Sequence, residues 1–190
     1  MVILAGKVHI STWYDEGIFP SDWKIALSDS GWTNDDLGLY WLKEVFDKST
    51  CSQAVGRYRL LILDGHGSHN TLEFDQYYKK KNIIVLCMPP HSSHLLQPLD
   101  VGIFSPLKQA YRQAIDANMR LGINHIDKQE FLRIYPLARA KAFTTSNIHG
   151  AFRGAGLVPL EPAIVLAHLK VEPRPITPTD STSLAMPFIL

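Results

Sequence analysis

The sequence predicts an α/β fold built on two parallel buried strands and the helix that crosses between them. Residues 58–63 and 83–87 are almost wholly apolar, which is typical of strands covered on both faces. Residues 70–81, between these strands, have the composition of a helix with a charged end at Lys79-Lys80-Lys81. Because a strand, a helix and a second strand follow one another, we expect a parallel pair with a helical crossover.

Composition describes one globular domain without the marks of a secreted or membrane protein. The chain has 190 residues, of which 46% are hydrophobic and 19% charged, enough apolar material for a core. Its formal charge of +1 means that any affinity for nucleic acid must come from local clusters or metal ions. Cys51 and Cys87 form no CxxC motif and no disulfide framework. We expect no membrane span and no signal peptide, because the apolar runs are too short.

The first half of the chain is expected to contain short strands and one amphipathic helix. Thr33 or Asn34 can cap that helix, with Asp35 and Asp36 placed favourably in its first turn. Its apolar residues recur at helical spacing and predict that it reaches about Asp47. The strands before it are expected at residues 2–5, 8–13 and 23–27, and Ser30-Gly31 at a turn.

A proline-rich loop at residues 88–98 follows the second buried strand, and its prolines predict a stiff backbone. A long helix is expected to begin just after Asp100. Apolar residues at helical spacing, from Val101 to Met119, define its buried face.

Shorter helices and a tail complete the chain. Asp127 is expected to cap a helix that ends near Pro136 or slightly beyond, and residues 144–155 are expected to form a last short helix. Prolines become frequent beyond that point. We therefore place one domain at residues 1–165 and a proline-rich, poorly ordered tail at 166–190.

Asp64 and Asp100 are the leading candidates for chemistry. Asp64 ends a buried strand, and Asp100 precedes a helix after 35 intervening residues that make one crossover. Two carboxylates placed in this way can converge on one divalent metal ion, as in metal-dependent phosphoryl transfer. The structural alternative is that each aspartate only caps the helix that follows it.

Four histidines near these aspartates allow two interpretations. They form two HxxH pairs, at 66/69 and 91/94, which could together hold a zinc ion. Neither pair has the helical backbone that would align its two rings, however. We favour His69 and His94 as hydrogen-bonding partners of the carboxylates or of a phosphate.

Cationic side chains offer further contacts with nucleic acid. Lys108 and Arg112 lie four residues apart on the helix after Asp100 and could follow a DNA backbone, although a solvated helix face explains them equally well. Lys79-Lys80-Lys81 is most simply a solvated helix end. Its functional interpretation is a phosphate contact or a short nuclear-import signal.

Several segments resemble the DDE endonuclease domain of pogo-type transposases, in particular those of the fungal pogo-like branch within the Tc1/mariner superfamily. The resemblance extends over roughly residues 3–165. The segments that carry it are WYDEGIFPSDW, GWTNDDLGLYWLKEVF, LLILDGHGSHNTLEF, NIIVLCMPPHSSHLLQPLDVGIFSPLKQAY and NIHGAFRGAGLVP.

The resemblance implies an RNase H-like (retroviral-integrase-type) mixed sheet flanked by helices. It also implies DNA as substrate, cleavage and strand transfer as the reaction, Mg²⁺ or Mn²⁺ as cofactor, and action in the nucleus. In that family three acidic residues hold two metal ions. Asp64 matches the second of them and Asp100 the third, so both are expected to be catalytic and metal-binding.

The first acidic residue of the family has no counterpart in this chain. It belongs to an early strand upstream of residues 2–13, so we expect an N-terminally truncated catalytic domain that lacks its first strands. Such a chain should have little or no activity, and whether it acts as an enzyme stays open. The unpaired sheet edge is expected to pair with a strand of another chain, and homo-oligomerisation is a related expectation. The alternative is a domesticated or remnant nucleic-acid-binding or interaction module without catalysis.

Overall fold

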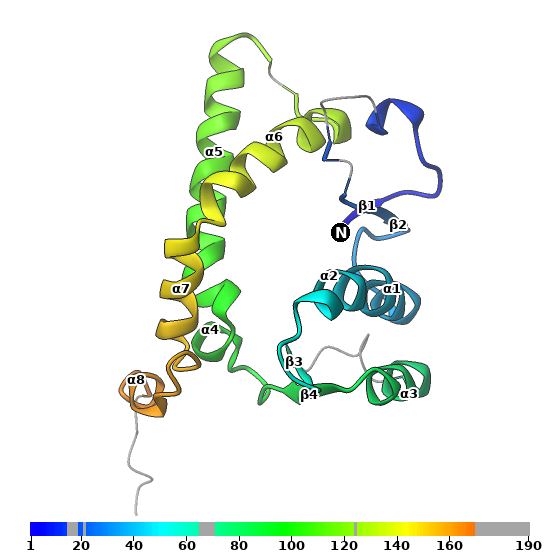
Figure 1. The fold of residues 1–190 in the computed structure, drawn as a ribbon. Coiled ribbons are helices and arrows are strands. Elements are labelled where there is room, and N and C mark those ends of the chain that lie inside the picture. Colours follow the sequence, from blue (N-terminus) through cyan, green and yellow to red (C-terminus); the bar gives the residue numbers. More distant parts are fainter. Residues whose placement is uncertain (15–18, 21, 65–70, 124, 170–190) are drawn as a thin grey trace, which may run out of the picture.

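The computed structural model describes residues 1–14, 19–20, 22–64, 71–123 and 125–169 (Figure 1). Strand β1 (Val2–Ala5) pairs in parallel with β2 (Ile25–Ser28), and β3 (Arg59–Leu63) pairs in parallel with β4 (Ile83–Cys87). The α/β prediction is confirmed in this form, as small parallel sheets combined with helices.

The predicted crossover is confirmed as β3, helix α3 (Leu72–Lys80) and β4. Its helix begins at Leu72 because the Thr71 hydroxyl accepts a hydrogen bond from the amide of Phe74, at 3.2 Å. The register pairs Arg59 with Ile83 and runs in step to the end of both strands. Strand pairing and helix capping therefore fix the geometry of this unit locally.

Between the crossover and β2 lies one nearly continuous helical stretch. Of the two candidate caps, Thr33 and Asn34, it is Asn34 that caps it, by accepting a hydrogen bond from the Leu37 amide at 2.9 Å. Its segments are α1 (Asp35–Trp41), η2 (Leu42–Asp47), α2 (Lys48–Thr50) and η3 (Cys51–Gln53). In Figure 1 these helices lie between the two sheets.

The expected strand at residues 8–13 is wrong, because none of these residues belongs to a strand. Residues Ser11–Tyr14 form a 3₁₀ turn, η1. The amide of Trp13 donates to the Ile10 carbonyl at 3.1 Å, and the indole is only 3% exposed, in a core that it shares with Leu132. Burial of this large side chain outweighs the β propensity of the segment.

The remaining helices form the other side of the molecule (Figure 1). They are α4 (Ser93–Leu96), η5 (Leu99–Ile103), α5 (Phe104–Arg120), α6 (Lys128–Ala142), α7 (Thr145–Gly154) and α8 (Pro162–Leu166). Helix α6, which the sequence predicts to end near Pro136 or slightly beyond, continues for six residues past this proline. Ala138 and Ala142 are buried beyond the proline, so packing sustains the helix past the lost hydrogen bond.

Among the described residues, each sheet takes part in one cluster of buried apolar side chains. In the first, Leu61, Leu63 and Ile83 pack against Leu42 and Phe74, both of which are fully buried. The second combines the β1–β2 sheet with η1 and α6, through Val2, Leu4, Trp13 and Leu132.

Asp47 is the only buried charged residue that the described ranges contain, and it joins three elements of the first core. Its carboxylate accepts a hydrogen bond from the Arg59 guanidinium at 2.6 Å and another from the Tyr77 hydroxyl at 2.8 Å. The Lys81 ammonium lies 3.4 Å from the same carboxylate. Arg59 also donates to the Thr50 hydroxyl at 2.9 Å. The network therefore ties the end of η2 to the start of β3 and the end of α3.

The network shifts the pKa values of two of its members, Asp47 and Tyr77. Burial alone would raise the pKa of Asp47, but the hydrogen bonds from Arg59 and Tyr77 and the charge of Lys81 outweigh it and lower that pKa. Burial raises the pKa of Tyr77 to about 12, and the hydrogen bond to Asp47 and its charge add to that rise. Both shifts favour an ionised Asp47 beside a neutral Tyr77.

Asp47→Ala should lower the free energy of unfolding by about 3 kcal/mol, because it leaves the partly buried Arg59 guanidinium without its counter-charge. Urea denaturation followed by circular dichroism measures the change. Glu44→Ala, which removes an exposed i,i+4 pair with Lys48, is the control and should cost at most about 0.5 kcal/mol. Equal losses in the two variants would contradict the structural role of Asp47.

Tyr77 should make stability depend on pH at the alkaline end. Its folded-state pKa of about 12 exceeds the ordinary value of 10.0. The contribution of neutral Tyr77 to the free energy of unfolding is therefore complete below pH 10 and is lost as the pH rises through 12. The difference in unfolding free energy between the wild type and Tyr77→Phe should be constant up to about pH 10 and shrink above it. A difference that does not change up to pH 12 would contradict the network.

Candidate active site at the end of β3

Asp64 lies at the carboxyl end of the β3–β4 sheet. The amide of Met88 donates to the carbonyl of Leu63 at 2.8 Å, so the strand pairing continues to the residue just before Asp64. Asp64 itself is half-buried. A side chain in this position lies at the edge where open α/β sheets keep their sites. Glycines 65 and 67 and the histidines 66 and 69, which follow it, lie outside the described residues.

The loop from β4 to Asp100 is a series of hydrogen-bonded turns and includes the short helix α4, which the sequence did not predict. The amide of Ser92 donates to the Pro89 carbonyl at 3.3 Å, and that of Gln97 to the Ser93 carbonyl at 2.9 Å. The amide of Asp100 donates to the Gln97 carbonyl at 3.0 Å. Asp100 lies in the first turn of η5, which begins at Leu99, and its side chain is exposed.

One cavity joins these two parts of the chain. Its volume is about 350 Å³, and its lining includes Asp64 from β3, Gln97 and Leu99 from the segment leading into Asp100, and Met1 and Ile3 from the β1 region. The side chain of Asp100 is not part of that lining. Asp64 and the turn that precedes Asp100 thus line the same cavity.

Close packing of η5 against α7 holds the segment that carries Asp100. A Cβ atom on Gly102 would lie 2.8 Å from the Cβ of Ala151, and one on Gly154 would lie 2.9 Å from Val101. Neither position can take a side chain without displacing its neighbour. Sequence reasoning missed this positioning role. The two glycines in otherwise helical segments were the available signal.

The structure describes three of the four other predicted site residues. His94 lies on α4 with an exposed side chain, and Lys108 and Arg112 are exposed on α5. His69 lies outside the described residues, so its predicted contact with the carboxylates stays a prediction. In the described ranges, no group of three or more His, Cys, Asp or Glu residues is placed to hold a metal ion.

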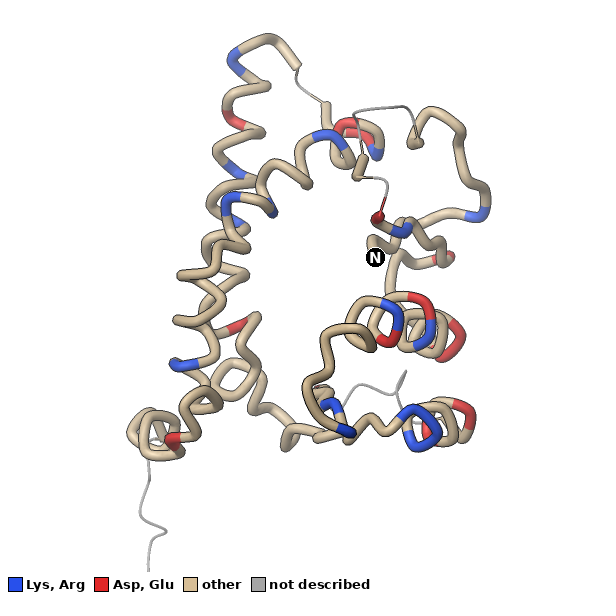
Figure 2. Tube along the Cα trace, in the orientation of Figure 1, with Lys and Arg blue, Asp and Glu red and all other residues tan. Residues whose placement is uncertain are grey.

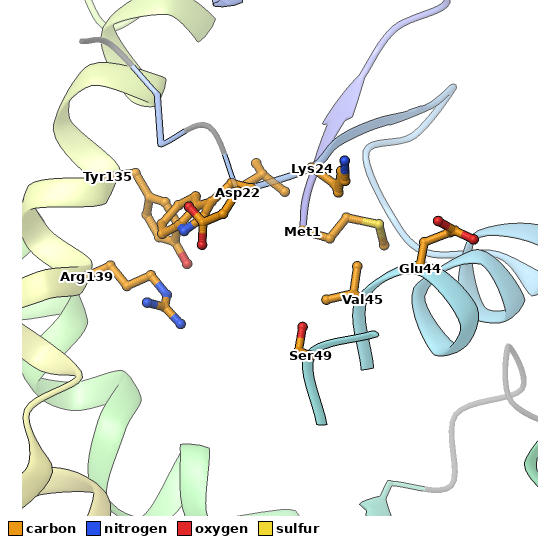
Figure 3. A pocket seen from close by; sticks show the side chains of 10 residues that line it. Met1, Asp22, Lys24, Glu44, Val45, Ser49, Tyr135 and Arg139 are labelled. Carbon is orange, nitrogen blue, oxygen red and sulfur yellow. The ribbon is translucent and has the colours of Figure 1, made fainter. Parts of the chain in front are cut away.

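A second cavity, of about 230 Å³, opens between β1, η2, α2 and α6. Figure 3 shows Tyr135 and Arg139 reaching in from α6, with Met1, Val45 and Ser49 opposite. The Arg139 guanidinium lies 5.1 Å from the centre of the Trp23 ring and 4.2 Å from that of Phe143. Neither Asp64 nor Asp100 lines this cavity, so it is not part of the candidate site.

The donor chemistry of the candidate site suits a hard divalent cation. Asp64 and Asp100 supply carboxylate oxygens, which Mg²⁺ and Mn²⁺ prefer, and not the sulfur or imidazole ligands typical of zinc. Two carboxylates make an incomplete ligand set. The remaining positions would be open to water, to a DNA phosphate or to a further acidic side chain.

Comparison with known proteins assigns the chain to a class. Residues 1–152 match the family described as DDE superfamily endonuclease. The chain therefore belongs to the DDE superfamily endonucleases. Over 102 residues it is 33% identical to the mouse "Pogo transposable element with KRAB domain" and 32% identical to its human counterpart, which confirms the pogo-type classification. Each match covers 53% of this chain and 16% of the relative.

Fungal relatives are more similar. The chain is 55% identical over 170 residues to "MFS-type transporter clz9" of Cochliobolus lunatus, a match that covers 90% of the chain and 18% of that protein. It is 47% identical over 73 residues to "Chaetoglobosin A biosynthesis cluster protein C" of Chaetomium globosum, covering 38% of the chain and 18% of that protein. The chain thus spans less than a fifth of the length of these curated relatives.

Two further searches gave negative results. No solved structure matches the chain. Among the described residues, no helix is both long and apolar enough to cross a membrane.

Proposed function

We propose that this chain is the metal-holding part of a pogo-type transposase catalytic domain, which cleaves DNA and transfers the cut strand in the nucleus. One observation carries the proposal. In a member of the DDE superfamily endonucleases, Asp64 and the turn before Asp100 line the same cavity at the carboxyl end of the β3–β4 pair.

In this proposal Asp64 and Asp100 hold divalent metal, Mg²⁺ or Mn²⁺. When bound, the metal supplies Lewis-acid stabilisation of phosphate charge and an activated hydroxyl nucleophile. The chain itself contributes by fixing the positions of the two carboxylates. Strand pairing up to Met88 fixes Asp64, and the packing of Gly102 on Ala151 fixes the segment of Asp100. Exposed Lys108 and Arg112 on α5, with His94 and His69, would contact DNA phosphates.

We propose an RNase H-like arrangement in which a further strand pairs with both β1 and β3. β1 and β3 each pair with one neighbour among the described residues, and the 350 Å³ cavity has lining residues from both strands. A strand placed there would join the two sheets into one mixed sheet. It could also carry a third carboxylate towards Asp64. Supplying that strand is the condition for activity in this proposal.

A form extended at its N-terminus should nick supercoiled plasmid DNA in the presence of Mn²⁺, whereas Asp64→Ala and Asp100→Ala should each abolish nicking. The reason is that two metal-holding carboxylates act as one unit, so the loss of either disables the centre. Gel electrophoresis of the plasmid measures the reaction, and Asp116→Ala, on the exposed part of α5, is the control.

For the 190-residue chain itself, wild type and Asp64→Ala should be equally inactive in the same assay. Nicking by the extended form that survives both substitutions would remove the catalytic assignment of Asp64 and Asp100.

The second candidate is an interaction module without catalysis, and the exposure of β3 and β4 favours it. On one face of this sheet, Leu60 is 57%, Ile84 52% and Leu86 48% exposed. Parallel strands are usually covered on both faces, so this surface and the unpaired edge of β3 are suited to a strand from another chain. A second copy of this chain is the simplest such partner.

Amide exchange along β3 tests this pairing residue by residue. The amide of Arg59 and the carbonyl of Leu63 both point to the β4 side, so by alternation Leu60 and Ile62 present their amides to the other edge. If a strand of another copy pairs there, these two amides should become protected as protein concentration rises. The amide of Leu61, which points to β4, is the internal control and should be protected from exchange at every protein concentration. Rapid exchange of Leu60 and Ile62 at every concentration would contradict strand pairing.

A further inference from the structure

Basic residues gather at the end of the β3–β4 sheet opposite Asp64. We define the basic cluster by its seven cationic side chains, which are Lys43, Lys48, Arg57, Arg59, Lys79, Lys80 and Lys81. They come from η2, α2, the start of β3 and the end of α3, and Figure 2 shows these positions in blue along neighbouring segments.

Specific contacts bring the elements of the basic cluster together. The ammonium groups of Lys43 and Lys81 lie 5.5 and 5.8 Å from the centre of the same Tyr77 ring. Arg57 and Lys81 each lie two residues before the paired Arg59 and Ile83, so both precede the amino end of the β3–β4 pair. Residues far apart in the sequence therefore share one surface.

The local charge differs from that of the whole chain. The basic cluster contains seven cationic groups and three carboxylates, those of Glu44, Asp47 and Asp75, an excess of four positive charges. The whole chain has a formal charge of only +1. The Asp47 side chain is 9% exposed and lies under Arg59 and Lys81, so little of its charge reaches solvent.

Three of the cations have no carboxylate partner. Lys43, Arg57 and Lys80 form no ion pair within the described residues. Arg57 instead lies 5.4 Å from the centre of the Tyr58 ring, which is 53% exposed. A cation stacked on an exposed aromatic ring is a common surface for nucleic acid, because the ring can also contact a base or sugar.

We propose that the basic cluster binds the phosphodiester backbone of DNA at a place separate from Asp64 and Asp100. β3 has five residues, so the two ends of the sheet are about 16 Å apart, and the basic cluster contacts phosphates away from the point of cleavage. The choice of DNA as the anion rests on the proposed function. The binding itself requires neither metal nor the two aspartates.

A triple variant of the full chain, with Lys43→Gln, Arg57→Gln and Lys80→Gln, tests the proposal. Fluorescence anisotropy measures its binding to a labelled DNA duplex, in EDTA, between about 25 and 200 mM NaCl. Each lost phosphate contact reduces the salt slope by about 0.9, so the slope should become shallower by roughly 2 to 3. Affinity at the lowest salt should fall at least about tenfold.

Lys7→Gln, Arg120→Gln and Lys141→Gln together form the matched control, because they remove the same charge from other exposed positions. This control should keep the wild-type slope. An unchanged urea midpoint shows that the triple variant is folded, since its three cations make no ion pair within the described residues.

Several results would overturn the proposal. They are a wild-type slope in the triple variant, an equal loss in the matched control, no binding of the wild type at 25 mM NaCl, or tighter binding to anionic lipid vesicles than to DNA. None of them decides the cleavage reaction, which the Asp64 and Asp100 variants of the extended form test separately.

Discussion

Parallel pairing of β3 with β4 is the constraint on which the rest of this structure depends. Parallel strands require a crossover, and here that crossover is α3. The same pairing places the carboxyl ends of both strands at one end of the sheet, where Asp64 and the loop that leads to Asp100 line one cavity. It directs both amino ends to the opposite end of the sheet, where Arg57 and Lys81 each lie two residues before the paired Arg59 and Ile83. One sheet thus separates the proposed chemistry from the proposed DNA-binding surface.

Asp47 stabilises this arrangement further. It is held by Arg59 at the start of β3 and by Tyr77 on the crossover helix, so it fixes the helix to the strand that precedes it. Arg59 has a double role, since it neutralises Asp47 in the interior and belongs to the basic cluster at the surface. The fold of this half of the chain and its surface charge therefore depend on the same side chains.

Local signals predicted most of the secondary structure, and tertiary contacts explain the rest. Apolar runs identified β3 and β4, and the cap residues Asn34, one of two candidates, and Asp127 marked two helix starts. The burial of Trp13 and the continuation of α6 past Pro136 depend on residues distant in sequence, so local pattern could not reveal them. For the site, sequence singled out Asp64 and Asp100, but it could not show the packing of Gly102 on Ala151, which involves two distant segments.

The central claim is that Asp64 and Asp100 share a divalent cation once a strand completes the sheet. Anomalous X-ray scattering from crystals of the extended protein soaked in Mn²⁺ tests it most directly. The account predicts a Mn²⁺ peak about 2.1 Å from a carboxylate oxygen of each aspartate. Mn²⁺ bound elsewhere, or two carboxylates too far apart to reach a common two-metal centre about 4 Å across, would contradict it.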